Sequence, residues 1–100
     1  MKMHREILEE AIVTFGVEAQ VDHAIEELGE LITALMELKR NTKNKPLRVQ
    51  AVRQEIADAL ISIEQLAIIF DEESVQKMIW EKMQFLTSLM RRYREQYHEQ

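Results

Sequence analysis

The sequence predicts an all-α protein, a four-helix bundle whose core is completed by homo-oligomerisation. Three observations support this class: 100 residues contain only two glycines and one proline, 46% are hydrophobic, and the apolar residues recur at helical spacing. A chain of this length fits a single domain, residues 1–100, but its core is thin enough for self-association to be expected.

Four helices follow from the apolar spacing and from the residues that interrupt it. We expect helices over about 2–14 and 17–40, separated by Gly16, because glycine commonly ends a helix. The polar, basic stretch 39–46 ends at the only proline and predicts a loop. A third helix then runs from residue 46 or 47 to about 70. The fourth begins in the acidic, capped turn 71–74, and its polar tail, 91–100, is expected to fray.

The second and third helices each carry a row of apolar residues that we expect to face the core. The rows are Val21, Ile25, Leu28, Ile32 and Leu35 in the second helix, and Val49, Val52, Ile56, Leu60, Ile63 and Ala67 in the third. Gly29 and Ala57 occupy equivalent positions in the two helices. Because both residues are small, we expect the backbones to approach closely there.

Two acidic phrases form the clearest candidate site. Glu27 and Glu30 are three residues apart, as are Glu55 and Asp58, so on helices each pair shares one face. Four carboxylates that face one another repel unless a cation lies between them, and Mg²⁺ prefers oxygen ligands. The spacing alone is equally compatible with a divalent-metal site and with a solvated acidic face.

Composition argues against several other classes of protein. A net charge of −5 disfavours nucleic acid as the main partner. The lack of cysteine excludes disulfides and thiolate metal sites, and favours an intracellular location. No apolar run approaches the roughly 18 residues that span a membrane, and residues 1–5 carry no signal-peptide apolar block. We therefore expect a cytoplasmic protein with no membrane partner.

The two acidic phrases also resemble a known family. Glu26-Glu27-x-x-Glu30, followed after 24 residues by Glu55-x-x-Asp58, is similar to the motif of the MazG-like nucleoside triphosphate pyrophosphohydrolases of the all-α NTP pyrophosphatase superfamily. The resemblance covers about residues 20–70 well and the flanks loosely. It implies a MazG-like helical bundle that cleaves (d)NTPs between the α and β phosphates. The implied cofactor is Mg²⁺, for which Mn²⁺ could substitute, and the implied role is nucleotide-pool cleaning or regulation.

The resemblance further implies a role for individual residues. The metal ligands would be Glu27, Glu30, Glu55 and Asp58. Glu26 would act in catalysis by orienting water. Lys82 and Arg91 would hold the substrate phosphates, although Phe85 and Ser88 stand where related sequences often have arginine. A second subunit is expected to complete the nucleotide pocket.

The sequence leaves alternative roles for several other residues and alternative functions for the protein. His23 lies one turn before Glu27 and could reach the site, but such a histidine is more often a surface residue. Phe15 and Trp80 suit stacking on a nucleobase, yet aromatic residues at this spacing more often belong to a core or interface. The alternative functions are a non-catalytic helical interaction or dimerisation module with a solvated acidic face, and a bundle holding redox iron or manganese, which would require histidine ligands.

Overall fold

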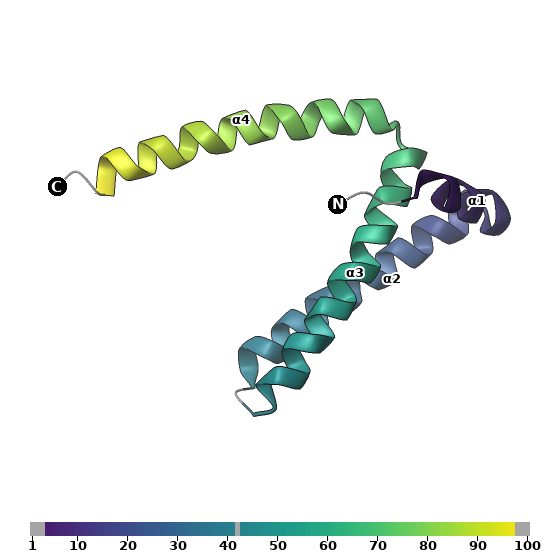
Figure 1. Ribbon diagram of the computed structural model, residues 1–100, viewed down its shortest axis with the longest axis horizontal. Helices are drawn as coiled ribbons and strands as arrows, with labels where there is room; N and C mark the ends of the chain where they lie inside the picture. The colour runs from purple at the N-terminus through teal and green to yellow at the C-terminus, as the bar shows by residue number, and fades with distance from the viewer. Residues whose placement is uncertain (1–3, 42, 98–100) are drawn as a thin grey trace. The chain divides into compact units, whose positions relative to one another are not determined.

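The computed structural model describes residues 4–41 and 43–97. Over these residues the chain forms four α-helices and no strand, which confirms the predicted all-α class: α1 (Arg5–Phe15), α2 (Val17–Arg40), α3 (Lys45–Ile69) and α4 (Glu72–Tyr97) (Figure 1). α1, α2 and α3 form one compact unit, and α4 forms a second. The expected helix start at residue 2, and the last three residues of the predicted frayed tail, lie outside the described residues.

The first unit is built on a hairpin of two long helices, α2 and α3, which lie side by side (Figure 1). The loop between them is shorter than the predicted stretch 39–46, because α2 continues to Arg40 and α3 already begins at Lys45. Pro46 is accommodated in the first turn of α3, where the missing N–H costs no helical hydrogen bond. Arg48 fastens this end of the hairpin, since its Nη1 lies 3.2 Å from Oε2 of Glu37.

Gly16 produces the break between α1 and α2. Its backbone adopts φ 89° and ψ 152°, a conformation that side-chain-bearing residues rarely enter. Its N–H donates to the carbonyl oxygen of Ile12 at 2.8 Å, which closes the last turn of α1. The chain turns at Gly16 and enters α2 at once, so α1 packs against both long helices and buries Leu8.

The face that α2 turns to α3 differs from the predicted apolar row. The buried residues of α2 are Gln20, Ala24 and Glu27, and those of α3 are Val52, Ala59, Ser62 and Gln65. Ile25 and Ile32 of the predicted row in α2 are 64% and 58% exposed, and Ile56 and Ile63 of the row in α3 are 41% and 44% exposed. The interface therefore lies one residue, about 100° of helix rotation, away from the row of large residues in α2.

Small side chains explain this choice of face. Ala24, Ala59 and Ser62 are each only 1% exposed, so small residues occupy the most deeply buried positions of the two helices. The predicted approach at Gly29 and Ala57 is wrong, because both residues are exposed and open space surrounds the position that a β-carbon on Gly29 would occupy. Several larger apolar side chains, including Ile25 and Ile32, are therefore exposed, whereas Val52 of the predicted row in α3 is buried.

The second unit is the single helix α4. It begins where the acidic turn 71–74 predicted, and Asp71 precedes it with a left-handed φ of 79°. The Ser74 hydroxyl donates to Oδ2 of Asp71 at 2.7 Å, and this bond, with the backbone N–H groups of Ser74 and Glu73, holds the pKa of Asp71 below its ordinary value. None of the described residues of α4 is buried. No helix in the described part of the chain has the length and apolar character required to cross a bilayer.

Candidate metal centre

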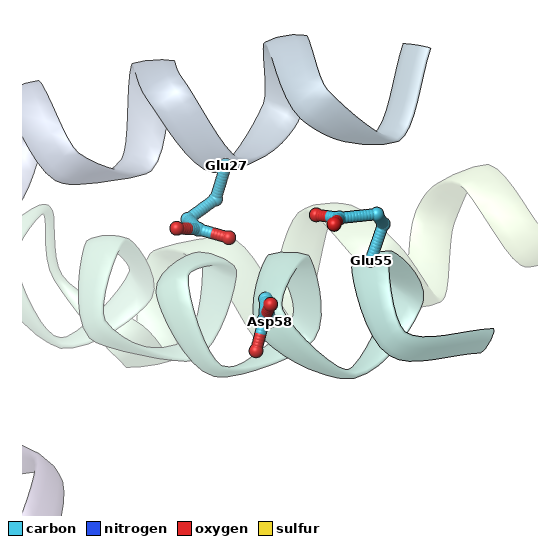
Figure 2. Close-up of side chains that lie close together, drawn as sticks. All are labelled: Glu27, Glu55 and Asp58. Atoms are coloured by element: carbon cyan, nitrogen blue, oxygen red, sulfur yellow. The ribbon is translucent and has the colours of Figure 1, made fainter. Parts of the chain in front are cut away.

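Three of the predicted ligands converge between α2 and α3. Glu27 of α2 and Glu55 and Asp58 of α3 each offer a carboxylate oxygen, and these three oxygens lie within 4.8 Å of one another. Figure 2 shows the carboxyl groups of Glu27 and Glu55 directed toward each other from the two helices, with Asp58 beside them. Three anionic groups thus surround one small volume.

The local sequence accounts for this arrangement. Glu55 and Asp58 are three residues apart in α3, so one helical turn brings their side chains to the same face. Glu27 follows Ala24 at the same spacing on the face of α2 that contacts α3. A carboxylate therefore occupies a position that an apolar residue usually fills in a helical hairpin. The apolar spacing predicted that Glu27 would lie beside the row that faces α3. Because the observed interface lies one residue away from that row, Glu27 lies within the contact between the two helices.

Glu27 and Glu55 each bury one carboxylate oxygen that has no hydrogen-bond donor. Glu27 is 9% exposed, and Glu55 is partly buried. One oxygen of each, Oε2, is shielded from solvent and accepts no hydrogen bond from the rest of the described chain. A buried ionised carboxylate without a partner is costly, so native structures normally supply a donor or a cation at such positions.

The pKa values of Glu27 and Glu55 also show that their charged forms are disfavoured. Burial raises the pKa of Glu27 above its ordinary value, and the charges of Glu30 and Asp58 raise it further, while His23 opposes them. Burial likewise raises the pKa of Glu55, together with the charges of Glu30 and Asp58 and a hydrogen bond with Glu30. Glu30 is thus a neighbour of Glu55, but it is exposed and is not one of the three residues whose oxygens converge.

Little positive charge from the described chain offsets these groups. Nε2 of His23 lies 3.5 Å from Oε1 of Glu27, and no lysine or arginine among the described residues of the α1–α3 unit, 4–41 and 43–69, forms an ion pair with the cluster. Sequence reasoning left the reach of His23 open, and the structure shows the contact. When its carboxylates are ionised, the cluster therefore needs a counter-charge that these residues do not supply.

The donor set fits a hard divalent cation. Mg²⁺ and Mn²⁺ favour carboxylate oxygens, and the two buried oxygens of Glu27 and Glu55 are free to serve as ligands. A redox-iron site of the carboxylate-bundle type would require paired histidines, and His23 is the sole histidine beside the cluster in the described part of the chain. The residues present therefore suit Mg²⁺ better than they suit a redox metal.

Glu26, Lys82 and Arg91, the other predicted site residues, were assigned roles other than metal binding. Glu26 is an exposed residue of α2, and its charge makes only the smallest of the contributions that raise the pKa of Glu27. Lys82 and Arg91 are exposed residues of α4. Their roles in orienting water and holding phosphate remain predictions.

Sequence reasoning missed a set of polar residues next to the cluster. Gln20, Ser62 and Gln65 are buried, and with His23 and Asp58 they line a cavity. Their helical spacing carried a usable signal, because Gln20, Ala24 and Glu27 follow one another at intervals of four and three. A polar residue in such a row is a candidate for the inner face of a helix, but the row of larger apolar residues beside it was the stronger pattern.

Comparison of the chain with protein-family models, curated proteins and solved structures finds no significant match.

Proposed function

We propose that this protein is a Mg²⁺-dependent nucleoside triphosphate pyrophosphohydrolase that converts a (d)NTP and water into a (d)NMP and pyrophosphate. The observation that carries the proposal is the convergence of Glu27, Glu55 and Asp58, with Glu30 beside them, from two helices. These are the four positions that the resemblance to MazG-like enzymes assigns to metal binding. A solvated acidic face would not require two carboxylate oxygens to be buried without donors.

The reaction transfers the α-phosphoryl group to water: an oxygen–phosphorus bond forms at the α phosphorus, and its bond to the bridging oxygen breaks. Bound Mg²⁺ would supply positive charge for the phosphate oxygens and acidify a water molecule. Glu27 and Glu55, partly shielded from solvent on rigid helices, would hold the ion in a fixed place. Glu26 would orient the attacking water, and Lys82 and Arg91 would bind phosphate charge that the metal leaves uncovered.

A pyrophosphate-release assay across the eight common NTPs and dNTPs, with Mg²⁺ and with EDTA, tests this proposal. We expect release from at least one nucleotide with Mg²⁺ and none with EDTA. Glu55→Gln should lower turnover by about a hundredfold or more, because it removes a metal ligand, while the helical far-UV spectrum persists. Near-normal turnover by the purified Glu55→Gln protein would refute the metal assignment. Glu10→Gln, an exposed acidic residue of α1, is the matched control.

We further propose that two or more copies associate through the exposed apolar faces. Within the described chain only four apolar residues are buried, Leu8, Ala24, Val52 and Ala59. Large apolar side chains are exposed on all four helices, including Ile32 of α2 and Trp80, Leu86 and Met90 of α4. So little buried apolar surface is a poor basis for a stable monomer of 100 residues.

Light scattering on the purified protein should therefore give at least twice the chain mass of 11.9 kDa. A monomeric mass at micromolar concentration would contradict self-association. We place the enzyme in the cytoplasm, acting in nucleotide-pool cleaning or regulation, where its substrates and Mg²⁺ are present.

The same exposed faces support a second candidate, a non-catalytic interaction or dimerisation module. This function accounts for the apolar residues of α4 without assigning chemistry to the carboxylates. It predicts self-association, no thermal shift with Mg²⁺ and no pyrophosphate release. The buried carboxylates of Glu27 and Glu55 favour the enzyme, because an interaction module gains nothing from charge repulsion inside its hairpin.

A further inference from the structure

A cavity of about 260 Å³ lies next to the carboxylate cluster, among residues of α1, α2 and α3. Asp58 belongs to both, since it lines the cavity and converges with Glu27 and Glu55. The cavity is thus adjacent to the candidate metal centre. Its volume is slightly below the range of about 300–1,000 Å³ typical of small-molecule sites, so it suits one part of a ligand whose remainder lies outside.

Three neutral polar side chains give this cavity its character. Gln20 and Gln65 are each 7% exposed and Ser62 is 1% exposed. The Ser62 hydroxyl oxygen is buried without a hydrogen-bond partner. Buried polar groups normally have partners, so the Ser62 hydroxyl indicates a bound group that supplies one, and the side chains of Gln20 and Gln65 line the same cavity.

The lining restricts the chemistry of that group. An apolar ligand would leave the Ser62 hydroxyl unsatisfied, and an anion would be repelled by Asp58. The two amides and the hydroxyl both donate and accept hydrogen bonds, which matches a neutral ring with donors and acceptors on its edge. Phe15 also lines the cavity and is 66% exposed, so its ring is available for stacking.

We propose that this cavity binds the nucleobase of the nucleotide, with Gln20, Ser62 and Gln65 hydrogen-bonding its edge. The inference rests on the proposed function, because the phosphates of the same ligand would lie toward the metal held by Glu27, Glu55 and Asp58. Recognition of the base is then separate from the metal chemistry and resides on the inner faces of α2 and α3. These three residues become the specificity-determining groups of the enzyme.

Nuclear magnetic resonance tests this placement on the wild-type protein without turnover. The side-chain amide signals of Gln20 and Gln65 are followed while AMP, GMP, CMP or UMP is added with Mg²⁺, and ribose 5-phosphate with Mg²⁺ is the control without a base. We expect at least one nucleotide to shift both amide signals and ribose 5-phosphate to leave them in place. Equal responses to nucleotides and ribose 5-phosphate, or no response to any nucleotide, would overturn the inference.

Substitution supplies the matched kinetic test. Gln65→Met keeps the length and volume of the side chain and removes its donor and acceptor, so the hairpin should remain folded. Losing one hydrogen bond to the base should raise KM for the preferred nucleotide roughly three- to tenfold. It should leave kcat and the Mg²⁺-induced thermal shift unchanged. Gln50→Met, at an exposed position of the same helix, should alter none of these quantities.

The two proposals fail in different ways. If the wild type releases pyrophosphate and Gln65→Met keeps an unchanged KM for every nucleotide, the base site is wrong and the enzyme stands. If no nucleotide is hydrolysed but the glutamine amides still respond to nucleotides alone, the enzyme is wrong and the cavity remains a nucleobase site.

Discussion

Replacing Glu27 by glutamine should make the metal-free protein more stable, because it removes a buried charge that other carboxylates oppose. The closest oxygens of Glu27 and Asp58 lie within 4.8 Å of each other. Two unit charges at that distance interact by about 1 kcal/mol in water and about 3 kcal/mol at an effective dielectric constant of 20. Asp58 is exposed, so solvent screening favours the lower part of this range. We expect Glu27→Gln to raise the free energy of unfolding by about 1–2 kcal/mol.

Thermal unfolding in EDTA at pH 7.5 measures this effect at one fixed protein concentration. The expected gain corresponds to a rise in Tm of roughly 5–15 °C for a domain of this size. Adding Mg²⁺ should then raise the Tm of the wild type, since the ion binds the folded state, and should raise that of Glu27→Gln much less. Asp22→Asn is the control, because Asp22 is an exposed residue of the same helix and does not perturb the pKa of Glu27.

A fall in Tm for Glu27→Gln in EDTA would contradict this expectation, since it would show that groups of the chain itself stabilise the charge of Glu27. An equal response of wild type and variant to Mg²⁺ would show that the ion binds elsewhere.

Two further predictions concern pH and the surface of α2. The pKa values of Glu27 and Glu55 are raised in the folded protein, so the folded state binds protons more tightly than the unfolded state does. Protonation of these two carboxyl groups therefore stabilises the fold, and this contribution is lost as pH rises through the folded pKa. The Mg²⁺-induced rise in Tm should accordingly be larger at pH 8 than at pH 5, and an equal rise at both would contradict the assignment. Gly29→Ala should raise the free energy of unfolding by about 0.5–1 kcal/mol, because a helical glycine is replaced where the added β-carbon meets no atom. Urea denaturation checks this change, and a destabilised variant would show that the site is covered.

The helix bounds were largely predictable from local chemistry. Gly16 ends α1, the acidic turn at Asp71 precedes α4, and the polar residues before Pro46 separate α2 from α3. Each of these signals depends only on neighbouring residues in the chain. For this reason the predicted span of the second helix, 17–40, agrees with α2.

The face through which α2 meets α3 could not be predicted in the same way. Two rows run along α2 one residue apart, and the row with Ile25 and Ile32 is the more apolar. The row with Ala24 faces α3 instead, because packing of small residues depends on what the partner helix presents. A count of apolar residues contains no information about that complementarity.

The convergence of Glu27, Glu55 and Asp58 was predicted from the sequence, but the surroundings of these residues were not. The spacing of Glu55 and Asp58 implied a shared face, since that relation lies within one helix. The position of Glu27 opposite them depends on the register between α2 and α3, which the spacing does not determine. The cavity beside Asp58 depends on three helices at once, so Gln65 and Ser62 drew no attention in the sequence.

Anomalous diffraction from a crystal of the protein grown with Mn²⁺ tests the central claim most directly. We expect a manganese ion about 2 Å from carboxylate oxygens of Glu27, Glu55 and Asp58. Well-ordered density in which these three carboxylates contact only water, with manganese bound elsewhere or absent, would contradict it.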